Sequence, residues 1–155
     1  MARSPVADEV HVGELTLADL SLESKWRVFG GYEEVRPGTA HSDGETLVWS
    51  VSPGEWTVLG ARPSHERVVD LTHVRAMFRL TGVEAATALS YDCALDLGDH
   101  MFPDHAAART LVAGVATELI RADLDATPSY LILPSRSFGR FAFLSVKRAA
   151  EGTVW

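Results

Sequence analysis

Alternating apolar and polar residues in the middle of the chain predict several short β-strands. The runs TLVWSV (46–51) and EWTVLG (55–60) are rich in β-branched and aromatic residues, and Ser-Pro-Gly separates them, which is typical of a hairpin. VVDLT (68–72) predicts another strand. In RAMFRLT (75–81) Ala76, Phe78 and Leu80 alternate with Arg75, Met77 and Arg79, so we expect that strand to bury one of its faces.

Two segments show the spacing of amphipathic helices. GVEAATALSYDC (82–93) places small apolar residues on one stripe, with Cys93 at its end, and predicts a short packing helix. SRSFGRFAFLSVKRAAEG (135–152) begins with serines that suit an N-cap and ends with a glycine that suits a helix stop. We expect Phe138 and Phe141 to lie on the buried stripe of this second helix.

The remaining segments are less regular. Residues 1–24 mix proline, glycine and acidic residues and predict an N-terminal arm with at most a short helical stretch, while KWRVF (25–29) predicts the start of an edge strand. ARTLVAGVATELIRA (108–122) is a long apolar run in which Gly114 suggests a bulge, so it predicts one bent strand. YLILPS (130–135) is apolar on both faces and predicts a central strand.

These elements predict an α+β fold with helices on one face of an antiparallel sheet. The order of strands and helices suggests a split βαβ, or ferredoxin-like, arrangement with an added N-terminal hairpin. We therefore expect an arm over residues 1–24 and a single domain over residues 25–155. A chain of 155 residues is long enough to bury a hydrophobic core without metal ions or disulfides.

The charge of the chain argues against two classes of partner. Its 14 basic and 21 acidic residues give a net charge of −7, which disfavours nucleic acid and anionic membranes as partners. No run approaches the roughly 18 apolar residues of a transmembrane helix. The chain has one cysteine, Cys93, which cannot form a disulfide within the chain, so we expect a cytoplasmic protein.

Four segments in a fixed order carry a resemblance to a known family. They are VVDLTHVRAMFRLTG (68–82), CALDLGDHMFP (93–103), ARTLVAGV (108–115) and PSRSFGRFAF (134–143). Together they resemble the γ subunit of heterotetrameric sarcosine oxidase, a family related to the folate-binding glycine-cleavage T-protein. The chain departs from the family pattern, which has serine, proline and alanine at these positions, at Thr81, Ala94 and Gly139.

The resemblance implies a role in one-carbon metabolism. A γ-subunit-like protein would be a non-catalytic structural partner of the flavin- and folate-containing subunits of an amine oxidase, or would form a homo-oligomer. A T-protein-like chain would instead act alone as a tetrahydrofolate-binding one-carbon, or aminomethyl, transferase. The sequence contains no glycine-rich phosphate loop, no serine nucleophile elbow and no HExxH motif. We therefore expect a subunit without catalytic residues, with the transferase as the alternative.

Three residues are candidates for contact with a ligand. Glu118 lies where folate-binding relatives carry two aspartates, and on a strand it shares a face with Gly114 and Ala116, whose small side chains would leave a void. The other interpretation of Glu118 is a solvent-facing strand residue. Asp70 ends a strand, where a carboxylate either caps a turn or contacts a ligand. Arg109 either binds a carboxylate or phosphate group or forms a surface ion pair.

Histidines and aspartates also cluster in GDHMFPDH (98–105). Imidazole and carboxylate groups ligate metal ions, but Pro103 separates His100 from His105 and prevents one helix face from presenting both. We therefore expect a solvated loop and no metal site. For Cys93 we expect a buried thiol without a catalytic partner.

Overall fold

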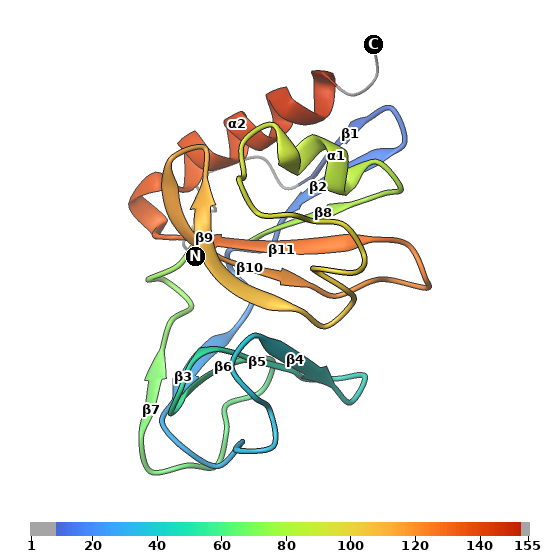
Figure 1. The fold of residues 1–155 in the computed structure, drawn as a ribbon. Coiled ribbons are helices and arrows are strands. Elements are labelled where there is room, and N and C mark those ends of the chain that lie inside the picture. The colour runs from blue at the N-terminus through green and yellow to red at the C-terminus, as the bar shows by residue number, and fades with distance from the viewer. Residues whose placement is uncertain (1–8, 153–155) are drawn as a thin grey trace.

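The computed structural model describes residues 9–152, whose strands form two antiparallel sheets (Figure 1). The first sheet consists, in spatial order, of β1 (Glu9–Val12), β2 (Leu15–Asp19), β8 (Phe78–Thr81), β11 (Ser129–Pro134), β10 (Val115–Arg121) and β9 (Ala107–Val112). The second sheet consists, in spatial order, of β4 (Thr39–Ser42), β5 (Leu47–Ser52), β6 (Glu55–Leu59), β3 (Lys25–Val28) and β7 (Val68–Asp70).

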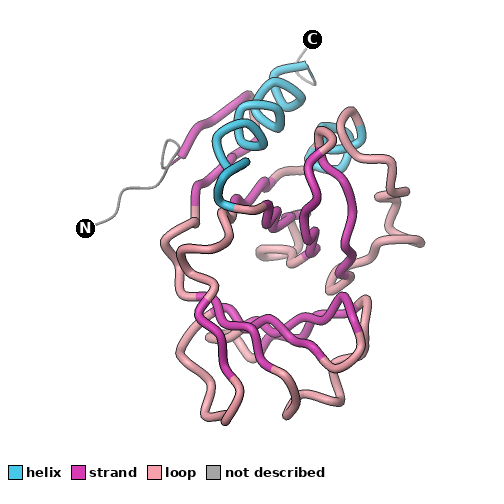
Figure 2. Tube along the Cα trace, turned by 90° about the vertical axis from the view of Figure 1, so that its left-hand side faces the viewer, coloured by secondary structure: helices cyan, strands magenta, loops and turns pink. Residues whose placement is uncertain are grey.

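Helices cover the face of the first sheet that is remote from the second sheet (Figure 1, Figure 2). The helices α1 (Ala85–Ser90) and α2 (Gly139–Gly152) contact each other, and the 3₁₀ turn η1 (Arg136–Phe138) leads into α2. The layers therefore follow in the order helices, first sheet, second sheet. This arrangement confirms the predicted α+β fold with helices on one face of an antiparallel sheet.

A separate hydrophobic core fills each boundary between layers. Between the helices and the first sheet, Phe78 and Leu80 pack with Phe143, and the rings of Phe78 and Phe143 meet edge to face with their centroids 5.2 Å apart. Between the two sheets, Trp49 of β5 packs in a cluster with Met77, which precedes β8. The segment at β8 thus buries side chains on both faces of the first sheet. The sequence predicted a single buried face, and the second buried face arises because the second sheet covers it.

Residues 9–19 form a hairpin of β1 and β2, not part of an arm. Strand β2 lies between β1 and β8 in the first sheet. Leu15 and Leu17 are 3% and 1% exposed and alternate with less buried neighbours, which is the pattern of a half-buried strand and not of a helical stretch. The prediction of an arm is therefore wrong for these residues. The domain begins no later than Glu9, while residues 1–8 and 153–155 lie outside the described residues.

Residues 107–121 also form a hairpin, where the sequence predicted one bent strand. Strands β9 and β10 pair antiparallel, and the two residues between them, Ala113 (φ 53°) and Gly114 (φ 77°), both have positive φ. Two successive positive φ values are the mark of a tight two-residue turn that reverses the chain. Gly114 therefore marks a reversal and not a bulge. Strand β9 becomes the edge of the sheet, and Glu118 on β10 lies in its interior.

The strand order differs in detail from a split βαβ unit, in which one strand lies between the two that a helix links. Here β11 and β10 both lie between β8 and β9, the strands on either side of α1, and neighbouring strands are antiparallel throughout. The hairpin predicted at residues 46–60 is present as β5 and β6. It belongs to a whole second sheet, in which β3 lies between β6 and β7 and is not an edge strand.

Helix α2 buries a different stripe from the predicted one. The residues that pack in the core under this helix are Ala142, Phe143, Val146 and Ala150. Phe138 and Phe141 are exposed instead. The predicted stripe and the observed stripe both have helical spacing, so the sequence alone does not determine which one is buried. The position of α2 on the first sheet determines it. Within the described part of the chain, no helix is long and apolar enough to cross a membrane.

Candidate functional site

Glu118 is buried between the two sheets and is paired with groups of the second sheet. Its Oε2 accepts a hydrogen bond of 3.1 Å from Nη2 of Arg27 on β3, and its Oε1 accepts one of 3.2 Å from Nε1 of Trp49 on β5. Only 2% of the Glu118 side chain is exposed. The sequence predicted a void or solvent at this position, and the second sheet, which it did not predict, fills that space.

Arg27 extends this contact to a second carboxylate. Its Nη1 donates a hydrogen bond of 3.1 Å to Oε2 of Glu55 on β6, so one guanidinium lies between two acidic side chains. The Arg27 Nε is buried and has no hydrogen-bond partner among the described residues. Each oxygen of the Glu118 carboxylate already accepts a bond from the protein. The arrangement therefore joins the sheets and leaves Glu118 little capacity to bind a folate ring or an amine.

Asp70 lies apart from this ion pair, at the end of the edge strand β7 of the second sheet. Its Oδ1 accepts a hydrogen bond of 2.9 Å from the backbone N–H of Thr72. Hydrogen bonds from the side chain and backbone of Thr72 lower the pKa of Asp70 below its ordinary value. The carboxylate thus caps the turn after β7, which is one of the two interpretations that the sequence left open.

Arg109 is exposed on the edge strand β9 and lies directly opposite Glu118 in the register of β9 and β10. Among residues 9–152, Arg109 forms no ion pair. The structure therefore brings Arg109 and Glu118 to neighbouring positions of one sheet, while Asp70 belongs to the other sheet. The three candidate residues do not form one site.

Lys25 is a buried charged residue that the sequence analysis missed. Its Nζ donates hydrogen bonds to the backbone carbonyls of Ser21 (2.8 Å), Glu23 (3.0 Å) and Thr72 (3.2 Å). Burial, reinforced by the charge of Arg136, lowers the pKa of Lys25 to about 8. The ammonium group holds the link between β2 and β3 against the turn after β7. A lysine at the start of a predicted strand is usually a surface residue, so no sequence pattern indicated this role.

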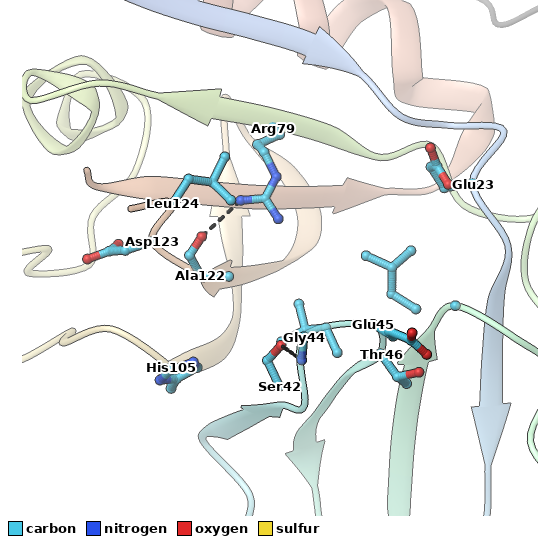
Figure 3. A pocket seen from close by; sticks show the side chains of 13 residues that line it. Glu23, Ser42, Gly44, Glu45, Thr46, Arg79, His105, Ala122, Asp123 and Leu124 are labelled. Atoms are coloured by element: carbon cyan, nitrogen blue, oxygen red, sulfur yellow. Dashed lines mark hydrogen bonds between the residues drawn. The ribbon is translucent and has the colours of Figure 1, made fainter. Parts of the chain in front are cut away.

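A cavity of about 350 Å³ lies between the two sheets (Figure 3). Arg79 of β8 and the segment 122–124 contribute to it from the first sheet, and the loop between β4 and β5 contributes from the second. Its charged and titratable lining residues are Glu23, Glu45, Arg79, His105 and Asp123. None of the three candidate ligand contacts from the sequence lines this cavity.

The outward side of η1 and α2 carries a row of apolar side chains. Phe138, Phe141 and Leu144 are 53%, 55% and 40% exposed and recur every three residues. Residues at this spacing are neighbours along one side of a helix. We call these three residues the α2 stripe. Isolated exposed apolar residues are ordinary, but a contiguous row that includes two aromatic rings is typical of an interaction surface.

The described residues assemble no metal cluster, and the hydrogen-bond partner of the Cys93 thiol among them is a threonine hydroxyl and not a base. Among residues 9–152, no group of three or more His, Cys, Asp or Glu side chains lies close enough to hold a metal ion. Cys93 is a free, buried cysteine whose Sγ lies 3.9 Å from Oγ1 of Thr110. His100 and His105 are both exposed in their loop, and each lies 3.7 Å from an aspartate oxygen, on Asp96 and Asp104 respectively.

Comparison with known proteins relates this architecture to solved structures of a known enzyme. No model of a known protein family matches the chain, and no curated protein matches its sequence. One chain of heterotetrameric sarcosine oxidase from Corynebacterium sp. U-96, solved in complex with pyrrole 2-carboxylate, aligns over 94% of this chain and 88% of its own, with a TM-score of 0.78 and 20% sequence identity. The fold is that of a sarcosine oxidase chain. The similarity to sarcosine oxidase extends over the two-sheet architecture as a whole, because the alignment covers nearly all of both chains.

Proposed function

We propose that this chain is a non-catalytic subunit of a multi-subunit amine oxidase, in the position of the γ subunit of sarcosine oxidase. The observation that carries the proposal is the extent of the likeness, since 94% of this chain aligns with 88% of the sarcosine oxidase chain. The ordered sequence segments over residues 68–143 support the same assignment. In such a complex the flavin and folate belong to the other subunits, where oxidation of a secondary amine releases a one-carbon unit.

The polar groups of the described residues suit a supporting role. The Glu118 carboxylate is engaged by Arg27 and Trp49, and the Lys25 ammonium is engaged by three backbone carbonyls. These contacts hold elements of the fold together. A catalytic group, in contrast, needs access to substrate and a partner that moves a proton.

We assign the α2 stripe to contact with another subunit of the oxidase. Aromatic side chains are enriched at protein interfaces, where burial of their large apolar surface stabilises association. Phe138, at the end of η1, and Phe141, in α2, are both exposed. Helix α2 itself lies on the face of the first sheet that is remote from the second sheet (Figure 1). Because the residues of the α2 stripe lie outside the hydrophobic cores, another subunit could bind over them without any rearrangement of the two sheets.

Co-expression with the flavin-containing subunits of a heterotetrameric amine oxidase tests the proposal. We expect the chain to elute with these subunits in size-exclusion chromatography, and we expect Phe141→Asp to weaken this association at least tenfold. Val83→Asp is the matched control, because Val83 is 74% exposed but lies outside the α2 stripe. A chain that remains monomeric, or forms only a homo-oligomer, beside an intact oxidase would contradict the proposal.

The alternative from the sequence, a stand-alone tetrahydrofolate-dependent one-carbon transferase, requires a ligand contact that Glu118 is poorly placed to make. Titration of the isolated chain with tetrahydrofolate and its 5,10-methylene form tests this alternative by calorimetry. Saturable binding would favour the T-protein-like interpretation. No binding at millimolar folate would favour the subunit. The cytoplasmic location predicted from the single cysteine stays a prediction, which fractionation of cells checks.

A further inference from the structure

Arg79 directs its guanidinium into the cavity between the two sheets (Figure 3). It alternates on β8 with Phe78 and Leu80, which pack under the helices, so its own side chain faces the second sheet. Its Nη1 donates hydrogen bonds to the carbonyl oxygen of Ala122 (2.9 Å) and to Oγ of Ser129 (2.8 Å). These bonds fix the direction in which the rest of the guanidinium points.

Most of the hydrogen-bonding capacity of Arg79 is unused within the protein. A guanidinium carries five N–H donors, of which three are on Nε and Nη2. Among the described residues, Arg79 forms no ion pair, and its hydrogen bonds to them involve Nη1 alone. Burial lowers the pKa of Arg79, and no neighbouring carboxylate offsets that effect. A partly buried cation without a counter-ion is destabilising, and an anionic group bound in the cavity would relieve this.

The cavity also carries acidic groups. Glu23 and Glu45 line it, are exposed, and form no ion pair among residues 9–152. Asp123 lines it too, but its two oxygens accept bonds of 2.9 and 3.1 Å from Arg121, a cation that Asp123 shares with Asp99. The lining charges that form no ion pair among residues 9–152 are therefore the cation of Arg79 and the anions of Glu23 and Glu45, of which Glu23 also acts at longer range on the Lys25 ammonium.

We propose that this cavity binds a small zwitterion of the free α-amino acid class. The carboxylate of the ligand lies against Nε and Nη2 of Arg79, and its ammonium group faces Glu23 and Glu45. A simple anion would satisfy Arg79 but be repelled by the glutamates, whereas a simple amine would be repelled by Arg79. The volume of about 350 Å³ holds a small amino acid together with some water. The proposal does not depend on the assembly of the chain into an oxidase.

Calorimetric and NMR titrations of the full chain with glycine, acetate and methylamine test this proposal. We expect saturable binding of glycine, with acetate and methylamine at least tenfold weaker. Arg79→Gln should weaken glycine binding at least about tenfold, since it removes a charge-assisted pair. Arg109→Gln, which removes an exposed arginine outside the cavity, should leave it unchanged. Glu45→Gln should weaken binding of glycine but not of acetate.

Three results would overturn the proposal. One is the absence of saturable glycine binding to the folded wild-type chain, and another is equal affinity for glycine and acetate. The third is unchanged glycine affinity in a folded Arg79→Gln variant. If Arg79→Gln fails to fold because the bond to Ser129 is lost, Glu45→Gln decides, since an exposed glutamate contributes little to stability. Glycine affinity unchanged by Glu45→Gln then counts against the site. A chain that binds glycine but never joins the oxidase would contradict the proposed function alone.

Discussion

Glu118 of β10 and Arg27 of β3 form an ion pair of 3.1 Å that joins the two sheets. Their side chains are 2% and 13% exposed, so either charge would be poorly solvated without the other. Trp49 and Glu55 engage the remaining oxygen of Glu118 and the other terminal nitrogen of Arg27. The boundary between the sheets therefore depends on paired charges as well as on the apolar cluster around Trp49.

Glu118→Gln should reduce the free energy of unfolding by about 2–3 kcal/mol, because it leaves Arg27 with a single, more exposed counter-ion. Urea unfolding followed by tryptophan fluorescence measures this loss. Arg109→Gln is the control, since Arg109 lies opposite Glu118 on β9 but is exposed and forms no described ion pair. We expect that change to stay within about 0.5 kcal/mol. Equal stability of the two variants would mean that the pair does not support the boundary between the sheets.

Truncation of two phenylalanines of α2, two positions apart, should change the stability by very different amounts. Phe143 is 3% exposed and meets the ring of Phe78 in the core, so Phe143→Ala should cost about 3–5 kcal/mol of stability. Phe141 is 55% exposed, so Phe141→Ala should change stability by less than about 1 kcal/mol. Thermal unfolding measured by circular dichroism compares the two. The reverse order of effects would mean that α2 is rotated on the sheet, with the predicted stripe buried.

The elements with a strong local pattern were predictable from the sequence. The hairpin of β5 and β6 is encoded by two β-rich runs around a turn. The helix predicted over 82–93 is present only as α1, which buries Ala85, Ala88 and Leu89, whereas Val83 of the predicted stripe is exposed. The buried stripe of α2 was not predictable, because apolar residues occupy two of its sides and only the packing on β8 selects Phe143 over Phe141. The strands β1 and β2 were missed because five-residue and shorter strands carry little signal beside proline and acidic residues.

The surroundings of the candidate residues depend on contacts distant in sequence. Glu118 pairs with Arg27 across 91 positions, and Lys25 contacts Thr72 across 47. The pattern of residues within one strand gives no information on contacts with residues so distant in the sequence. The turn-capping interpretation of Asp70, in contrast, was available from the sequence, because its partner Thr72 lies two residues away. Local polar contacts were thus accessible to prediction, and the polar contacts between sheets were not.

Lys25 should make the stability of the protein rise with pH in mildly alkaline solution. Its pKa is about 8 in the folded state and 10.5 in the reference state, so the unfolded chain binds the proton more tightly. Where the unfolded state holds more protons, the free energy of unfolding increases with pH, by up to about 1.4 kcal/mol per pH unit for one group. We expect this increase to begin near pH 8 and to be absent well below it.

Urea unfolding of the wild type and of Lys25→Met between pH 7 and 10 measures the difference in slope. The Lys25→Met variant should lack the increase of stability with pH. The raised pKa of Tyr130 lowers stability at still higher pH, but it does so equally in the wild type and the variant. If Lys25→Met does not fold, because three carbonyls lose their donor, NMR titration of the Lys25 side chain in the wild type gives its pKa directly. Parallel pH profiles, or a Lys25 pKa near 10.5, would contradict the prediction.

Gly82 tests the place of the β1–β2 hairpin in the sheet. It has φ 146°, and a Cβ added there would lie 2.6 Å from Cδ2 of Leu15 and 3.2 Å from the carbonyl oxygen of Glu14. Gly82→Ala should therefore cost about 2–4 kcal/mol, through backbone strain and overpacking. Gly114→Ala, at φ 77° with no atom within 4 Å of the new Cβ, should cost only about 1 kcal/mol. Leu15→Ala would remove part of the clash at Gly82. In urea unfolding, the double variant Gly82→Ala/Leu15→Ala should therefore lose less stability than the sum of the losses of the two single variants. If Gly82→Ala and Gly114→Ala cost the same stability, and if the effects of Gly82→Ala and Leu15→Ala are additive, residues 9–19 do not pack beside β8. That result would favour the predicted arm.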